Sequence, residues 1–162
     1  MGHFVGLLTP ESIYHHFISS ANKQMLAMVS GGFFGLLCLI GLVMLIKRRL
    51  TDDRVKASSK TSDVVVLFML LIQLVLGLIT IFVSMDHLDG SVMIQLANWA
   101  QSIVTFQGMQ AAASIEHVNI IYKLHIFVGL SMVLMFPFTR LVHIISAPVW
   151  YLGRRYQIVR QR

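Results

Sequence analysis

The chain has 162 residues, of which 56% are hydrophobic and only 12% are charged, and its net charge is +6. A water-soluble domain carries about twice that charged fraction, so the composition excludes an ordinary soluble protein and indicates an integral membrane protein. The single cysteine, Cys38, lies inside an apolar run, which excludes a disulfide framework or a thiolate metal site within one chain.

The first ten residues, MGHFVGLLTP, are apolar and contain one histidine, His3. Ten residues cannot cross a bilayer as a helix. The segment 1–10 is therefore either a partial helix, the outer end of one whose inner part is absent, or a short segment at the membrane interface.

Two apolar runs without charge follow, at 25–46 and 64–85. Each is long enough to cross a hydrocarbon layer about 30 Å thick. The first contains glycines that include a small-xxx-small pair, Gly31 and Gly35, which favours close helix packing, although close approach to a flat cofactor needs the same glycines. Gln73 and a few hydroxyl groups interrupt the second.

The polar stretch 86–118 contains no lysine or arginine, and apolar residues recur within it at helical spacing over 90–106. We predict an amphipathic helix there, lying at the membrane interface. A third span is predicted over 119–146. After it, the tail 147–162 places two aromatic residues, Trp150 and Tyr151, before a series of arginines, as in an interfacial anchor.

The positions of lysine and arginine predict the orientation of these spans. Six of the 13 lie in loop 47–63 and five lie from Arg140 onward, so this loop and the C-terminus are expected in the cytoplasm and loop 86–118 outside. Such clusters can also bind nucleic acid, but here they flank apolar spans, and we expect no nucleic-acid partner. The predicted fold is an all-α integral membrane helical bundle, a single domain over 1–162, with three full transmembrane helices plus a partial N-terminal helix.

Two histidines lie near the ends of the third span, where ionisable groups are costly and usually functional. His125 and His143 are 18 residues apart, which is five helical turns, so in a straight helix both rings would project from one face about 27 Å apart. One metal cannot bind both histidines at this distance. Two b-type haems, one above the other in the membrane, could each be bound by one of these histidines. The outer residue, His125, then needs a second ligand, and His3 lies at the same depth by the predicted topology. Pro137 between them would kink the helix. The alternative is that both histidines are interfacial or hydrogen-bonded core residues.

Lys23 lies just before the first span, on the predicted outer side. It is either a snorkelling anchor or a hydrogen-bond donor to a quinone headgroup near the haem. Zinc is a weaker prediction than haem, because no close cluster of His, Asp or Glu occurs. The other histidines fall in polar outer stretches, where solvated surface positions are expected: His15, His16, His87 and His117.

Six segments carry a resemblance to a known family: GHFVGLLTP, CLIGLVMLIKRRL, HLDGSVMIQLANWAQSIVTF, YKLHIFVG, FPFTRLVH and APVWYLGRRYQIVR. They resemble the gamma subunit of membrane-bound respiratory nitrate reductase, the di-haem cytochrome b of that complex, over essentially the whole chain. The resemblance implies five transmembrane helices, two b haems and a place in the bacterial inner membrane. It also implies oxidation of menaquinol or ubiquinol near the periplasmic face, with electrons passing to an iron–sulfur beta subunit and a molybdenum alpha subunit that reduces nitrate.

The same resemblance implies roles for five residues. By motif, His3 and His125 resemble the distal haem pair, His143 resembles one proximal haem ligand, and Lys23 and Gly2 match positions around the quinol pocket. The sequence departs from the family because it begins partway through what should be the second helix. The upstream histidine that should pair with His143 is absent, so we expect a complete distal site and a proximal site that lacks one ligand.

Two other function classes compete with this interpretation. Three spans with basic cytoplasmic ends would also suit a membrane anchor that tethers a soluble partner and binds no haem. A transporter would need interrupted helices and charges at mid-membrane, and the first two spans contain no charge.

Overall fold

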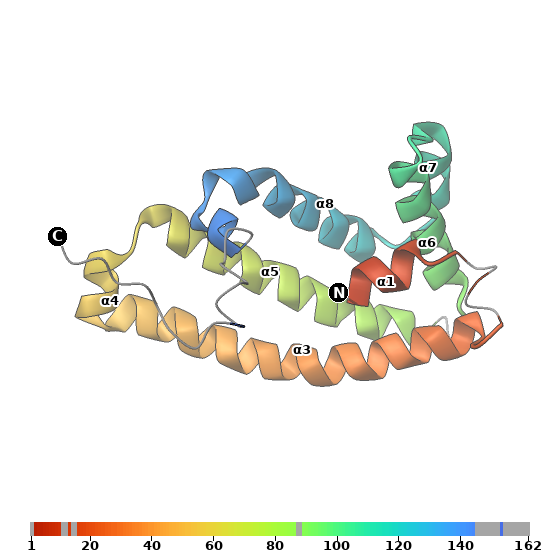
Figure 1. The fold of residues 1–162 in the computed structure, drawn as a ribbon. Coiled ribbons are helices and arrows are strands. Elements are labelled where there is room, and N and C mark those ends of the chain that lie inside the picture. Colours follow the sequence, from red (N-terminus) through yellow and green to blue (C-terminus); the bar gives the residue numbers. More distant parts are fainter. Residues whose placement is uncertain (1, 11–12, 14–15, 87–88, 145–152, 154–162) are drawn as a thin grey trace.

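A computed structural model describes residues 2–10, 13, 16–86, 89–144 and 153. Regular structure in these ranges is helical, and three long helices lie along one another (Figure 1). The elements in chain order are α1 (Gly2–Leu8), α3 (Ser20–Thr51), α4 (Asp53–Ser58), α5 (Thr61–Ser84), α6 (Ser91–Val104), α7 (Gly108–Ile115), α8 (Ile120–Met135) and the 3₁₀ turns η1 (Phe136–Phe138) and η2 (Arg140–Ile144).

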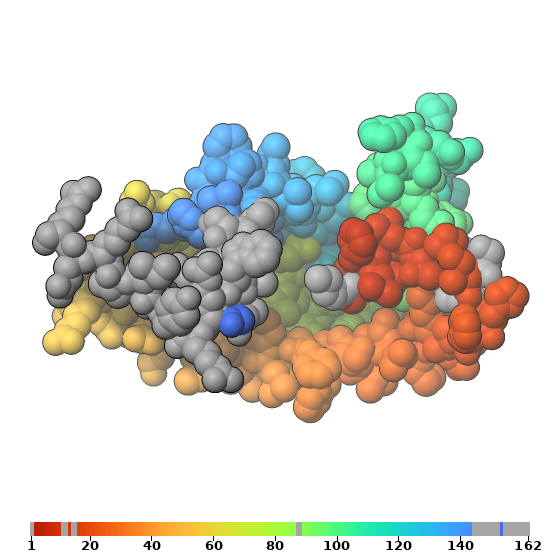
Figure 2. Space-filling model, in the orientation of Figure 1, coloured from red at the N-terminus to blue at the C-terminus, as the bar shows by residue number. Residues whose placement is uncertain are grey.

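Three segments are long and apolar enough to cross a membrane: Ser20–Thr51, Thr61–Ser84 and Ile120–Phe138. This confirms the predicted helical membrane bundle with three full spans. Many large apolar side chains on these segments are exposed, as expected where lipid is the solvent. The body is elongated, and α7 projects from one end of it (Figure 2).

Helix α5 is the central element, because it packs against both α3 and α8. A Cβ atom placed on Gly35 of α3 would lie 2.8 Å from Leu78 Cδ2 of α5, so this glycine allows the close approach of the two helices. Of the two interpretations of the glycines in this span, the structure places Gly35 in helix packing.

Polar contacts join neighbouring helices at each end of the bundle. At the end that carries α4, Arg49 and Arg140 both lie 3.4 Å from Asp63 Oδ2. At the end that carries α6 and α7, the hydroxyl oxygens of Tyr122 and Ser84 are 2.5 Å apart, and the Tyr122 hydroxyl also donates to the carbonyl of Thr80. These contacts tie neighbouring helices together at both ends.

The third span differs from the expected 119–146. The α-helix ends at Met135, and one 3₁₀ turn continues it to Phe138. Pro137 has no N–H to donate and its ring clashes with the preceding turn, so the α-helix cannot continue through it. His125 and His143 therefore do not lie on one continuous helix.

The segment between the second and third spans also differs in detail from the prediction. The expected helix over 90–106 is present as α6, and a separate helix, α7, follows it. Gly90 precedes α6 with φ of 85°, and a Cβ atom there would lie 2.8 Å from the Ser20 carbonyl carbon, so only glycine fits. The predicted aromatic anchor, Trp150 and Tyr151, lies outside the described residues, as do His15 and His87.

Candidate functional site

Two histidines from opposite ends of the sequence lie next to each other. The ring centroids of His3, on α1, and His125, on α8, are 6.1 Å apart, and the ring planes are inclined by 37°. Helix α1 is held in place by α6, because the Gln101 side chain donates to the Leu7 carbonyl at 3.2 Å and to the Thr9 carbonyl at 3.5 Å. Figure 1 shows α1 beside the spans rather than in line with one of them.

The His125 ring is packed closely against α5. A Cβ atom on Gly77 would lie 3.1 Å from His125 Cε1, so the ring occupies the space that a side chain would take. The side-chain nitrogen of Gln73, one turn earlier on α5, lies 3.4 Å from His125 Nε2. The other ring nitrogen, Nδ1, is buried and has no hydrogen-bond partner among the described residues.

This arrangement fits a metal held between two imidazoles. Two metal–nitrogen bonds of about 2 Å each, with about 1 Å from each nitrogen to its ring centre, together span about 6 Å. The observed separation of 6.1 Å matches that span. In the described part of the chain, His, Cys, Asp and Glu side chains form no group of three or more that could hold a metal. The pair could offer two imidazole nitrogens, and haem is a group that two histidines can hold.

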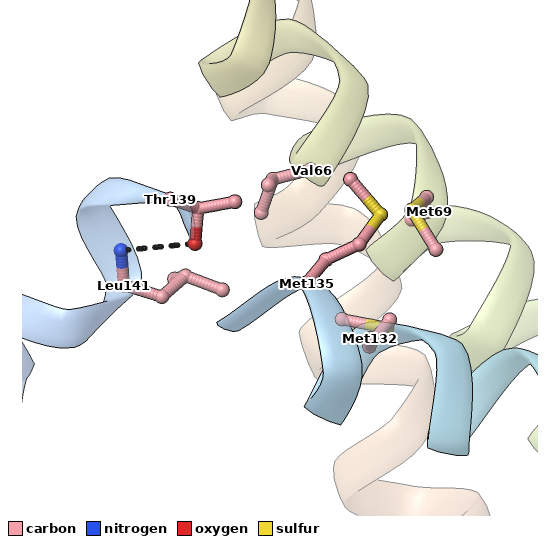
Figure 3. Close-up of a pocket in the computed structure, with 6 residues that line it drawn as sticks. All are labelled: Val66, Met69, Met132, Met135, Thr139 and Leu141. Carbon is pink, nitrogen blue, oxygen red and sulfur yellow. Dashed lines mark hydrogen bonds between the residues drawn. The ribbon is translucent and has the colours of Figure 1, made fainter. Parts of the chain in front are cut away.

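His143 is not part of this pair. It lies on η2, which follows the end of α8 opposite to His125 (Figure 1), and its side chain is exposed. A small open hollow lies between this region and α5. Figure 3 shows its lining, in which the Leu141 N–H donates to Thr139 Oγ1 and the other side chains come from α5 and α8: Val66, Met69, Met132 and Met135. The hollow is apolar apart from Thr139 and is smaller than a usual ligand pocket.

Lys23 and Gly2 are on different elements. Lys23 lies in the first turn of α3, at the end of the bundle that carries α6 and α7, and it is half-buried. Gly2 begins α1, next to His3, and is exposed. Both therefore belong to the part of the molecule that contains the His3–His125 pair, whereas His143 does not.

In the sequence alone, Gln73 stands out only as an interruption of an apolar run. The signal that could have drawn attention to it is its position, because it is the one amide in a span without charge. Tyr122 and Ser84 were likewise missed, since hydroxyl groups near the ends of spans are common and only the fold brings these two together.

Comparison with known proteins finds one matching family model and several related chains. A family model described as "Nitrate reductase gamma subunit" matches residues 1–162. The chain is 49% identical over 162 residues to "Respiratory nitrate reductase 1 gamma chain" of Escherichia coli (strain K12), covering 100% of this chain and 72% of that one. It is 35% identical over 162 residues to "Nitrate reductase gamma chain" of Bacillus subtilis (strain 168), covering 99% and 72%. It is also 30% identical over 168 residues to "Nitrate reductase-like protein NarX" of Mycobacterium tuberculosis (strain CDC 1551 / Oshkosh), covering 100% of this chain and 25% of that one.

Proposed function

Because the chain belongs to the nitrate reductase gamma subunit family, we propose that it is the haem b subunit that oxidises quinol near the periplasmic face of the inner membrane. It is a multi-pass membrane subunit of nitrate reductase, with three helices that can span the bilayer. In the proposed function it passes electrons to an iron–sulfur beta subunit and a molybdenum alpha subunit in the cytoplasm.

The observation that carries the proposal is the His3–His125 pair. The 6.1 Å between the two ring centroids supports the proposal that His3 and His125 would hold a haem iron between them. When bound between them, haem supplies a carrier that takes up one electron at a time. His3 and His125 would hold the haem, and α6 fixes the helix that carries His3.

The quinol is bound near the same end of the bundle. Lys23 donates a hydrogen bond to a quinol oxygen, and the absence of a side chain at Gly2 leaves room for the headgroup beside His3. Oxidation of a quinol releases two protons and two electrons. The protons leave on the periplasmic side while the electrons move inward, and this separation conserves energy.

The other end of the bundle faces the cytoplasm in this proposal. The lysines and arginines of loop 47–63 lie there, which the positive-inside rule favours. Asp63 binds both Arg49 and Arg140 and so orders the end that the cytoplasmic subunits would meet. His143 on η2 is the proposed ligand of a second, proximal haem.

Reduction of the haem by quinol tests the proposal. In membranes that contain the chain and haem, we expect a menaquinol or ubiquinol analogue to produce the ferrous b-type absorption that dithionite also produces. Absorption that appears with dithionite but not with either quinol would contradict quinol oxidation. A preparation without b-type absorption would instead favour a membrane anchor that binds no haem.

A further inference from the structure

The turn between α6 and α7 has an unusual backbone conformation. Phe106 has φ of 60°, and no other described residue apart from glycine has a positive φ. The Gln107 N–H closes the turn by donating to the Ser102 carbonyl at 2.8 Å. Glycine adopts this left-handed conformation without strain, whereas a bulky aromatic residue is strained in it. Phenylalanine is therefore unfavourable for the turn itself, and its side chain has to be explained by what it contacts.

The rest of the described chain does not cover this side chain. Phe106 is 96% exposed, and Met109, three residues later on α7, is 90% exposed. Two residues just before the turn, Ile103 and Val104, are also exposed. The tip of the hairpin formed by α6 and α7 thus presents a group of large apolar side chains. Such a patch usually marks a contact with something outside the chain.

The composition of the hairpin favours lipid as this contact. Residues 90–115 contain no Asp, Glu, Lys, Arg or His. Surfaces in water normally carry charges of both signs, and interfaces with other proteins normally have a polar rim around an apolar centre. The polar side chains next to this tip are amides and hydroxyls, such as Thr105 and Gln107, which form hydrogen bonds with water and lipid headgroups but carry no charge.

The direction of the hairpin also fits a contact with lipid. Figure 1 shows α6 and α7 running across the long direction of α3, α5 and α8, at one end of the bundle. Because the three long helices cross the membrane, a hairpin that runs across them lies along the membrane surface. Helix α8 follows α7 directly, and it exposes the large apolar side chains of Ile120 and Phe127. The tip therefore extends the apolar surface that the spans present to lipid.

We propose that the turn between α6 and α7 is a membrane wedge, in which Phe106 and Met109 insert into the lipid leaflet at this end of the bundle. Transfer of the aromatic ring from water into the leaflet offsets the strain of the backbone that presents it. Because the hairpin contains no lysine or arginine, insertion requires no anionic headgroup. The predicted interfacial helix over 90–106 thereby acquires specific inserted side chains at its turn into α7.

The test places a bimane fluorophore on single cysteines of the full chain in phosphatidylcholine vesicles. The background is Cys38→Ser, because Cys38 is the one native cysteine. Met109→Cys and Phe106→Cys carry the fluorophore at the tip. At both positions we expect quenching by a phospholipid with a nitroxide near its headgroup, protection from iodide in the water, and emission shifted to shorter wavelength than at a water-exposed position. The measurement requires neither haem nor quinol, so its outcome is independent of the proposed function.

His117→Cys is the matched control, because His117 is exposed between α7 and α8, next to the charged Glu116. It should be quenched by iodide and not by the nitroxide lipid. Iodide quenching at Met109→Cys as strong as at His117→Cys would overturn the wedge, and so would protection from both quenchers, which would indicate cover by protein. If the two tip variants differ, Met109→Cys decides, because it retains Phe106. A requirement for added phosphatidylglycerol would contradict insertion of an uncharged tip.

Discussion

Replacement of His125 by leucine is expected to remove the haem between α1 and α8. In the proposed function His125 is the ligand that α8 supplies, and without it the iron would keep one of its two proposed histidine ligands, His3, on the short helix α1. We expect the reduced-minus-oxidised b-type absorption of this site to be lost, while the protein still inserts, because leucine suits a membrane span. The measurement is the difference spectrum of membranes, normalised to the amount of inserted protein.

Two further variants make this result specific. His3→Leu should have the same effect, since it removes the partner ligand. His117→Leu serves as the control, because His117 is exposed and lies between α7 and α8, away from the ring pair. A full b-type signal from this site in His125→Leu would rule out the assignment, and so would an equal loss in His117→Leu.

The second large effect is expected from Lys23→Ala. A hydrogen bond to a charged donor contributes about 1.5–3 kcal/mol, so its removal should slow reduction of the haem by quinol about ten- to hundredfold. Dithionite should still reduce the haem fully, because Lys23 is not a ligand. The measurement is the rate at which ferrous b-type absorption develops after a quinol analogue is added.

Lys123→Ala is the matched control for this variant. Lys123 lies in the first turn of α8, and its ammonium group donates to the Glu116 carbonyl at 2.8 Å. If Lys23→Ala reduced its haem as fast as the unsubstituted chain, Lys23 would be only an interfacial anchor. Equal slowing in both variants would point to a general effect of surface charge.

The number and approximate positions of the spans could be predicted because a membrane leaves few choices. A charge-free run such as 64–85 has to satisfy its backbone internally, and a helix is the simplest way to do so. The residues at which the helices begin and end could be predicted less well. Helix α3 begins at Ser20, before the predicted 25–46, since Ser19 Oγ accepts the Asn22 N–H and starts the helix in the polar region.

The candidate site could be predicted only in part. A straight third span would have placed His125 and His143 on one face, but the chain turns after Pro137 and the second histidine lies on a separate 3₁₀ turn. The proximity of His3 and His125 followed from topology and from the resemblance. The contact of Gln73 with His125 depends on how α5 and α8 are rotated against each other. The two side chains lie against glycines of the facing helices, Gly129 and Gly77, and these glycines have no distinctive pattern in the sequence.

The central claim, that His3 and His125 hold one haem iron between them, is tested most directly by electron paramagnetic resonance of the oxidised chain in membranes, in the His143→Leu background. Two imidazole ligands produce a strong axial field. We therefore predict a low-spin ferric signal with bis-imidazole character that disappears in both His3→Leu and His125→Leu. A high-spin signal, or a low-spin signal that survives either substitution, would contradict the account.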